Sequence, residues 1–150
     1  MKGTYVLIIE NSKDMEAKIG KIGNIEFKKG FYAYVGSALS GLEQRIERHL
    51  RAVGKNKKLH WHIDYFLACH TVGVKEVVFA ETDERKECEI ASKMNRDREL
   101  DLIKNFGCTD CSCRSHLFLS TSLARLKEHI YKSFYESGLE HLLATKINPV

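Results

Sequence analysis

The feature that most constrains this chain is a change in hydrophobic period near residue 40. Residues 4–10 (TYVLIIE) and 31–36 (FYAYVG) are rich in β-branched and aromatic side chains, which is typical of strands. After them, apolar side chains recur at nearly every fourth position, at Leu42, Ile46, Leu50 and Val53. That spacing gives a helix one apolar stripe, so the first third of the chain predicts an α+β fold.

Local signals indicate where these elements begin and end. Ser40 and Glu43 match the S-x-x-E capping box that often begins a helix, and Gly54 is expected to end it. Short apolar alternations around Gly20 and Gly23 predict an additional hairpin between the two strands.

The remainder of the chain continues in the same mixed pattern. We expect helices over about 60–69, from 82 or 83 to about 98, and over 123–138, strands over 74–81 and 117–121, and a loop over 106–116. A short helical tail should follow. No segment has the composition of a linker or the period of a repeat, so residues 1–150 are expected to form one compact domain.

The composition excludes several classes of protein. With 43% apolar residues, one proline and ten glycines, the chain is neither disordered nor collagen-like. Its longest apolar run near the start, Tyr5 to Ile9, is too short for a membrane span or for the core of a secretory signal. We therefore expect a cytoplasmic protein that does not enter a membrane.

Basic residues are concentrated in the first 60 positions. Twelve Lys or Arg face six Asp or Glu there, which leaves +6, whereas residues 61–150 hold twelve against fourteen. A segment of this charge attracts polyanions such as DNA, although it can also be an ordinary solvated surface. The side chains expected to contact phosphates are Arg48, Arg51, Lys55, Lys57 and Lys58.

The cysteines are clustered. The chain has five, and Cys108, Cys111 and Cys113 lie within six residues. An odd number cannot all pair within one chain, and clustering near a histidine is more typical of a metal site than of a disulfide framework. Cys88, Cys111, Cys113 and His116 offer ligand types that zinc prefers, so a structural Zn²⁺ is one hypothesis. Buried, unreactive thiols in a core are the alternative.

Two short motifs and one helix carry a resemblance to a known family. Gly3-Thr4-Tyr5 lies on the first expected strand, Tyr34-Val35-Gly36 on the second, and Arg45 and His49 follow one turn apart on the helix. In this order they resemble the GIY-YIG nuclease superfamily, which includes homing endonucleases and the incision subunit of bacterial nucleotide excision repair. By helical period, Arg45 and His49 lie beside the apolar stripe, where a helix can face a cleft.

Three longer segments resemble one branch of that superfamily, an uncharacterised, mainly archaeal family that is sometimes fused to endonuclease-III-type repair domains. They are KLHWHIDYFL at 58–67, ECEIA at 87–91 and FGCTDCSCRSHLF at 106–118. The resemblance covers about residues 3–119 and leaves 120–150 as a C-terminal helical extension. It implies a small, mostly antiparallel three-stranded central sheet flanked by helices, with an inserted hairpin and an extra C-terminal helix.

The resemblance also implies an activity. A metal-dependent endonuclease of this type would hydrolyse phosphodiester bonds in DNA, in repair or recombination intermediates, and leave 5′-phosphate and 3′-hydroxyl ends. Tyr5 or Tyr34 would assist the deprotonation of water. Arg45 and His49 would bind the scissile phosphate, and Glu87 would hold one Mg²⁺ or Mn²⁺ ion. Such hydrolysis requires these groups, because charge develops on the phosphate oxygens while water is activated.

Two glutamates compete for the metal. On a helix, Glu87 shares the face of Ile90 and Met94, whereas Glu89 points to roughly the opposite side. The superfamily's glutamate is followed at three and four positions by apolar residues, and Ile90 and Ala91 have that spacing from Glu87. We therefore assign Glu87 and keep Glu89 as the alternative.

Two departures from the superfamily motivate a competing function. Tyr5 and Tyr34 are much further apart than usual, which the inserted hairpin would explain. The superfamily's late asparagine has no clear counterpart, because Asn95 and Asn105 both lie at unsuitable distances from Glu87. The alternative is a nucleic-acid-binding module on the same fold that does not cut, with or without a stabilising zinc.

His60 and His62 flank Trp61 ahead of an expected helix and are candidate residues of the cleft. If residues 60–64 were extended, His60, His62 and Asp64 would share a face and could form a metal trio. If they are helical, only His60 and Asp64 meet. A helix N-terminus with a packed tryptophan explains these residues more simply.

Overall fold

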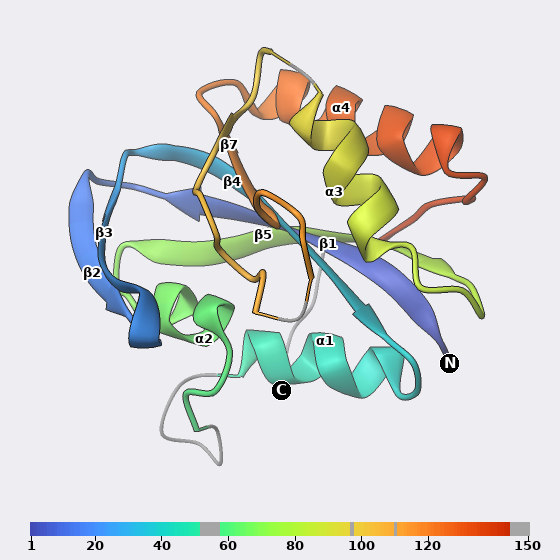
Figure 1. Cartoon of the computed structure of the whole chain (residues 1–150), viewed down its shortest axis with the longest axis horizontal. Coiled ribbons are helices and arrows are strands. Elements are labelled where there is room, and N and C mark those ends of the chain that lie inside the picture. Colours follow the sequence, from blue (N-terminus) through green and yellow to red (C-terminus); the bar gives the residue numbers. More distant parts are fainter. Residues whose placement is uncertain (52–57, 97, 110, 145–150) are drawn as a thin grey trace.

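Strands and helices are mixed along the chain. The computed structural model describes residues 1–51, 58–96, 98–109 and 111–144 (Figure 1). In chain order the elements are β1 (Gly3–Asn11), β2 (Met15–Ile19), β3 (Gly23–Phe27), β4 (Gly30–Ala38), α1 (Leu42–Leu50), α2 (His62–Leu67), β5 (Val72–Glu81), α3 (Glu87–Asn95), β6 (Asp101–Leu102), β7 (Leu117–Ser120), α4 (Leu123–Glu136) and β8 (Leu142–Ala144). A short 3-10 helix, Gly20–Ile22, lies between β2 and β3.

Six strands form one antiparallel sheet in the order β6-β7-β4-β1-β5-β8. The expectation of a small three-stranded sheet is therefore wrong. β4, β1 and β5 form the centre, but β7 pairs with β4 and carries β6, and β8 pairs with β5. A three-stranded sheet would leave the outer N–H and C=O groups of β4 and β5 unpaired, and the added strands satisfy them. Strands as short as β6 and β8 leave almost no hydrophobic period in the sequence.

The inserted hairpin does not disturb the central strands. β2 and β3 form a separate two-stranded sheet, while β1 and β4 pair without interruption over nine residues each. The hairpin leaves the sheet at one end of that pair, and the ring of Phe27 packs 4.4 Å from the ring of Phe66 in α2. The long sequence separation between Tyr5 and Tyr34 is therefore accommodated outside the sheet.

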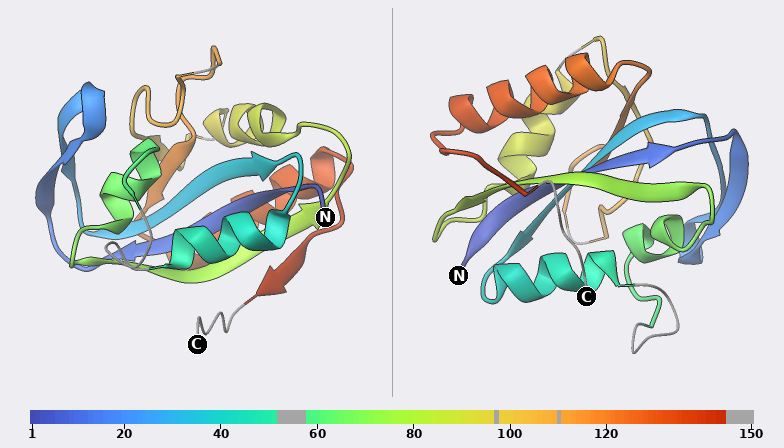
Figure 2. Two further views of the ribbon diagram at one scale, coloured as in Figure 1. Left: turned by 90° about the horizontal axis from the view of Figure 1, so that it is seen from below. Right: turned by 180° about the vertical axis from the view of Figure 1, so that it is seen from behind.

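The six-stranded sheet has helices on both faces. α1 and α2 cover one face, and α3 and α4 cover the other (Figures 1 and 2). Because side chains alternate along a strand, β1 contributes to both cores. Tyr5, Leu7 and Ile9 pack on the α1 and α2 side, and Val6 and Ile8 pack on the α3 and α4 side. β1 is therefore the strand around which both hydrophobic cores are organised.

The start of α1 differs from the expectation. The helix follows Gly41, whose left-handed φ of 64° turns the chain, and no side chain caps it. The predicted capping box of Ser40 and Glu43 is therefore wrong. The N–H of Leu42 instead donates to the carbonyl oxygen of Met1 at 2.8 Å, which satisfies one of the free donors at the helix end.

Two further boundaries differ. α3 begins at Glu87 rather than near residue 82, because β5 continues to Glu81 and the chain must then turn. The expected helical tail is strand β8, since the edge of β5 offers unpaired backbone groups. Val53 and Gly54, expected at the end of α1, lie outside the described residues. None of the helices within the described ranges is long and apolar enough to cross a membrane.

Gly36 is expected to be hard to replace, because Tyr5 lies directly across from it on β1. A Cβ at Gly36 would lie 2.5 Å from Cζ and Oη of Tyr5, whose side chain is only 2% exposed and has little room to move. Gly36→Ala should lower the free energy of unfolding by about 1–3 kcal/mol. Urea unfolding followed by circular dichroism would measure the change.

The matched control is Gly73→Ala on β5, where a Cβ would meet nothing within 4 Å. It should change the free energy of unfolding by less than about 0.5 kcal/mol. Equal effects of the two substitutions would contradict the assigned role of the Tyr5–Gly36 contact.

Candidate active site and metal centre

A cavity of about 710 Å³ gathers many of the residues that the sequence singled out. It is lined by Tyr5 on β1; Tyr34, Gly36 and Ser37 on β4; Arg45 on α1; His60, Trp61 and His62 at the start of α2; Arg85, Glu87 and Cys88 at the start of α3; and Gly107, Thr109, Cys111 and His116 before β7. Among the predicted catalytic residues, His49 alone does not line it. Both candidate cleft histidines do.

His49 lies behind Tyr5 rather than on the cavity surface. Both residues are 2% exposed, and a hydrogen bond of 2.6 Å joins Tyr5 Oη to His49 Nε2. Burial raises the pKa of the Tyr5 phenol well above its ordinary value, although the Arg45 guanidinium opposes this shift. Tyr5 is therefore neutral at ordinary pH. His49 is placed to exchange a proton with Tyr5 and not to contact a phosphate in the cavity.

Tyr34 reaches the cavity from the neighbouring strand and is partly exposed to it. Burial, followed by unfavourable interactions with Tyr5 and Asp64, raises the pKa of its phenol. Its ring packs against the rings of His49 and Phe106, with centroids 6.1 Å apart in both pairs. A neutral hydroxyl on a rigid strand can donate to or accept from a molecule in the cavity.

Trp61 holds the arginine of the cavity in place. The guanidinium carbon of Arg45 lies 4.6 Å from the centroid of the Trp61 ring, and Arg45 Nη1 donates to the carbonyl oxygen of Ser37 at 3.2 Å. A cation–π contact orients a guanidinium while leaving N–H groups for a phosphate. Sequence reasoning treated Trp61 as a packing residue, although its place in the segment 58–67 was an available signal.

Arg48 forms an ion pair with a buried carboxylate. Its guanidinium donates to both carboxylate oxygens of Asp64 at 2.9 and 3.0 Å, and Asp64 is fully buried. The same carboxylate accepts the backbone N–H groups of His60 and Trp61. Burial alone would raise the pKa of Asp64, but these donors lower it below its ordinary value. The pair fastens α1 to the start of α2, and thereby holds one wall of the cavity.

The other basic side chains expected to contact phosphates are dispersed. Arg51 pairs with Glu47 on the surface of α1 at 2.6 Å, and Lys58 is exposed. Lys55 and Lys57 lie outside the described residues. Arg85, which sequence reasoning overlooked, lines the cavity with a side chain that is 68% exposed. It is therefore a more direct candidate for contact with a phosphate.

Glu87 and Glu89 lie in different surroundings. The Oε2 atom of Glu87 is buried without a hydrogen-bond partner in the described part of the chain, and Oε1 lies 3.8 Å from Nε of Arg85. Glu89 is more exposed and forms ion pairs with Lys86 and Lys93. A buried carboxylate oxygen without a partner is costly unless a ligand binds it, so Glu87 is the stronger candidate for a metal ligand.

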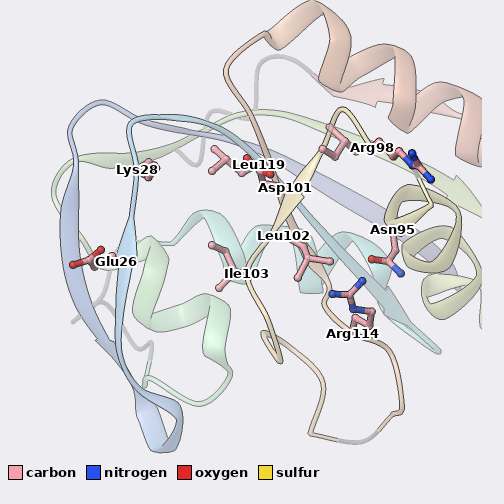
Figure 3. Close-up of a pocket in the computed structure, with 10 residues that line it drawn as sticks. Glu26, Lys28, Asn95, Arg98, Asp101, Leu102, Ile103, Arg114 and Leu119 are labelled. Carbon is pink, nitrogen blue, oxygen red and sulfur yellow. The ribbon is translucent and has the colours of Figure 1, made fainter.

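Neither candidate asparagine lines the cavity. Asn95 lines a different pocket of about 590 Å³ near β6, together with Arg98, Asp101 and Arg114 (Figure 3). Asn105 takes a left-handed φ of 65° before β7, and its N–H donates to the carbonyl oxygen of Arg114. Within the described ranges, no asparagine contributes to the cavity.

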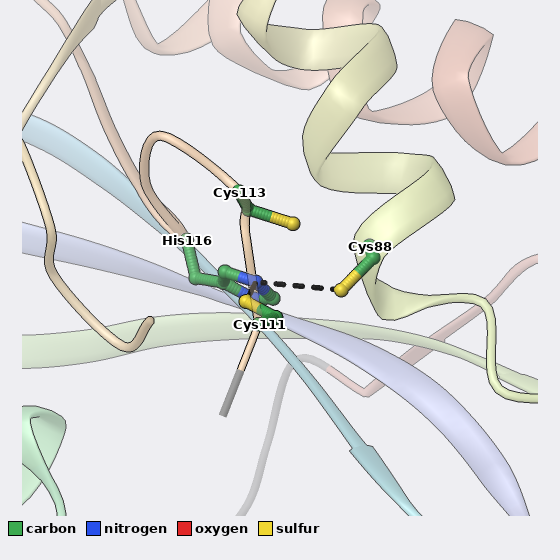
Figure 4. Close-up of side chains that lie close together, drawn as sticks. All are labelled: Cys88, Cys111, Cys113 and His116. Atoms are coloured by element: carbon green, nitrogen blue, oxygen red, sulfur yellow. Dashed lines mark hydrogen bonds between the residues drawn. The ribbon is translucent and has the colours of Figure 1, made fainter. Parts of the chain in front are cut away.

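Three cysteines and a histidine, of which all but Cys113 line the cavity, converge on one another (Figure 4). The sulfur atoms of Cys88, Cys111 and Cys113 and a ring nitrogen of His116 all lie within 4.8 Å of one another. His116 Nε2 is 3.4 Å from Cys111 Sγ and 3.9 Å from Cys88 Sγ. All the cysteines are free thiols, so no disulfide competes with this arrangement. These four residues could hold a metal ion.

A backbone carbonyl orients the histidine as a metal ligand. His116 Nδ1 lies 3.1 Å from the carbonyl oxygen of Val35. Because a carbonyl only accepts, Nδ1 carries the proton and Nε2 keeps a lone pair. Burial lowers the pKa of His116, which keeps the ring neutral. Metal-bound histidines commonly have this arrangement, with the second ring nitrogen bonded to a carbonyl or carboxylate.

The fold and the site together define an α+β domain in which tyrosine, arginine and glutamate side chains meet in one cavity beside a candidate metal centre. The chain belongs to the DUF123 family, a domain of unknown function whose family model matches residues 4–139. That span runs from the second residue of β1 to beyond the end of α4. No curated protein and no solved structure matches the chain.

Asp64→Asn should destabilise the fold, because it leaves Arg48 and two backbone donors around a neutral group. The expected loss in the free energy of unfolding at pH 7 is about 3 kcal/mol. The folded-state pKa of Asp64 is lowered, so the stabilisation is complete above the unfolded-state pKa of about 4 and is lost as the pH falls through the folded-state pKa. Urea unfolding at a series of pH values, from pH 7 to below the unfolded-state pKa of Asp64, would measure how this stabilisation changes.

The difference in the free energy of unfolding between wild type and Asp64→Asn should therefore become smaller as the pH is lowered. Glu47→Gln is the matched control, since Glu47 pairs with Arg51 on the exposed face of α1, the helix that carries Arg48. Its stability should change little at any pH. An Asp64→Asn variant as stable as wild type at pH 7 would contradict the anchoring role.

Proposed function

We propose that this protein is a metal-dependent endonuclease of the GIY-YIG type that hydrolyses phosphodiester bonds in DNA. The observation that carries the proposal is the convergence of Tyr5, Tyr34, Arg45 and Glu87 on one cavity from four separate elements. A cavity in which a few polar and titratable groups converge is the first candidate for a catalytic site. These groups also follow one another along the chain in the order that the resemblance implies.

Glu87 supports a divalent ion in the cavity. Its Oε2 atom is buried without a partner among the described residues, and Mg²⁺ and Mn²⁺ prefer carboxylate oxygens as ligands. Such an ion, when bound, supplies positive charge to the phosphate oxygens and lowers the pKa of a bound water. Glu87 would hold it from the first turn of α3.

The other residues act on the water and the phosphate. Arg45, oriented by Trp61, donates to a non-bridging phosphate oxygen and offsets the charge that develops there. The Tyr34 hydroxyl positions the attacking water. A proton accepted at Tyr5 Oη can pass to His49 Nε2 along their 2.6 Å hydrogen bond. Water attacks phosphorus, the P–O3′ bond breaks, and the leaving 3′ oxygen takes up a proton, which yields 5′-phosphate and 3′-hydroxyl ends.

Positive charge supports DNA as the substrate. The first 60 residues carry a formal charge of +6, and the exposed Arg85 lies at the cavity itself. Lysine and arginine contacts to phosphates give affinity and orientation without sequence specificity. The proposed substrates are accordingly recognised by their structure, as repair or recombination intermediates would be.

Glu87→Gln should strongly reduce cleavage without altering the fold, because the amide keeps the side chain's shape but loses the charge that binds the ion. We expect a loss on the order of 100-fold or more. The assay is cleavage of end-labelled single-stranded, duplex, flap and branched DNA with Mg²⁺ or Mn²⁺. Glu89→Gln is the matched control on the same helix and should cut at the wild-type rate.

One observation favours a second function. Because no asparagine among the described residues lines the cavity, the domain could bind nucleic acid without cutting it. In that case wild type, Glu87→Gln and Glu89→Gln would bind DNA equally, and none would release products that depend on metal. Failure of the wild type to bind any of the four DNA structures would contradict both functions.

We also propose that the ion held by the three cysteines and the histidine is zinc. Thiolates and one neutral imidazole are a ligand set of structural zinc sites. With Zn–S near 2.3 Å and Zn–N near 2.1 Å, a tetrahedral site places sulfur and nitrogen ligands roughly 3.6 Å apart. The separations of 3.4 and 3.9 Å between His116 Nε2 and two of the sulfurs are close to this value.

Purified protein should therefore contain about one zinc per chain. Cys111→Ser should lose it, because serine is a poor zinc ligand, whereas Cys69→Ser, outside the cluster, should retain it. Elemental analysis by plasma mass spectrometry would measure the zinc content. Equal zinc in the two variants would contradict the assignment.

A further inference from the structure

We infer that the metal centre of Cys88, Cys111, Cys113 and His116 is a brace that positions Glu87 relative to the strand that carries Tyr34. The inference rests on the proposed function, and it gives the four ligands a positioning role in the reaction rather than a chemical one. One side of the centre is Cys88 on α3, and the other side is His116, which is hydrogen-bonded to Val35 on β4.

The centre is suited to a structural role by its ligand count. Four protein ligands would complete a tetrahedral site and would leave no open position for water or substrate. Cys88, Cys111 and His116 nevertheless line the cavity that holds Glu87. The centre is therefore adjacent to the proposed chemistry without taking part in it.

The first turn of α3 is packed into the core at Ile90, but the contacts at its very beginning are weak. Its N-cap residue, Lys86, makes no side-chain capping hydrogen bond, and helix ends without caps tend to fray. The ion pair between Glu87 and Arg85 spans 3.8 Å, and the Arg85 side chain is 68% exposed, so the pair contributes little. Cys88 directly follows Glu87. A metal bond to Cys88 would thus fix the backbone that carries the catalytic carboxylate.

The opposite end of the centre is attached to the central sheet. His116 Nδ1–H donates to the carbonyl oxygen of Val35 at 3.1 Å, and the N–H of Val35 donates to the carbonyl oxygen of His116 at 2.9 Å. Val35 lies between Tyr34 and Gly36 on β4. The histidine ligand is therefore held by the strand that places Tyr34 in the cavity.

α3 already packs on β4, because Ile90 and Val35 share one hydrophobic core, and the four ligands add a second connection through the loop before β7. In the described part of the chain, no backbone hydrogen bond joins the loop of residues 103–116 to α3. Cys111 and Cys113 belong to this loop, and Cys88 belongs to α3. A metal ion bound to Cys88 and His116 would add to this packing and would fix the start of α3, with Glu87, against the loop that Val35 holds.

Cys113→Ser tests the brace, because Cys113 is the one ligand of the four that does not line the cavity. Cys108→Ser is the matched control, with the same substitution in the same loop but outside the ligand set. Three quantities are measured on the full chain: zinc content, the dissociation constant for Mn²⁺ by electron paramagnetic resonance, and hydrogen exchange at residues 87–91 by mass spectrometry.

We expect Cys113→Ser to lose zinc, to bind Mn²⁺ roughly 10- to 100-fold more weakly, and to exchange faster at residues 87–91. Its cleavage of DNA should recover in part at high Mn²⁺, which a globally misfolded protein would not do. Cys108→Ser should match the wild type in all these measurements. Loss of zinc with unchanged Mn²⁺ affinity and unchanged exchange would overturn the brace, as would a wild type without zinc.

The nuclease assignment can fail separately. If wild type contains zinc and binds Mn²⁺ through Glu87 but does not cut DNA, the proposed function is wrong and the brace still stands or falls on Mn²⁺ affinity and exchange. If wild type binds no Mn²⁺, hydrogen exchange at residues 87–91 alone decides whether the brace is correct.

If Cys113→Ser unfolds, Cys113→His is the second variant, because histidine provides a nitrogen ligand in place of the thiolate. Retained zinc with near wild-type exchange then supports the brace, and retained zinc with fast exchange overturns it.

Discussion

The pairing of β1 with both β4 and β5 is the constraint on which the rest of the structure depends. β1 is buried along nearly its whole length, and its alternating side chains enter both hydrophobic cores. A shift of its register by one residue would exchange the two faces and would remove Tyr5 from its place across Gly36. The hydrogen bond between Tyr5 and His49, and the contact of Tyr5 with the cavity, are therefore consequences of the same ladder that holds the sheet.

The two walls of the cavity are held by different interactions. On one side, Asp64 binds Arg48 and two backbone N–H groups, and Trp61 orients Arg45, so burial and charge keep α1 and α2 together. On the other side, α3 and the loop before β7 meet through thiols and one imidazole. The first wall is complete without any ligand. The second offers soft donor atoms that a metal ion would join, and the carboxylate of Glu87 lies at its edge.

Hydrophobic period located the central strands, the inserted hairpin and α4, because each is long enough to show alternation or a stripe. It could not locate β6 or β8, whose few residues are ordered by the edges of neighbouring strands. Helical period separated Glu87 from Glu89, because side chains two positions apart point to different sides of a helix. It could not foresee that Arg48 has a buried carboxylate partner, since that partner lies in another helix.

The sequence by itself determined which residue types were available and how they are spaced: the tyrosines on two strands, the arginine and histidine one turn apart, and the cysteines clustered near a histidine. Only the tertiary structure decided how these groups meet. It placed His49 behind Tyr5, engaged Arg48 with Asp64, and brought Cys88 from α3 to His116 before β7. The reason is physical: period and spacing are properties of neighbouring residues along one element, whereas a cavity or metal centre depends on the register and packing of elements distant in the chain.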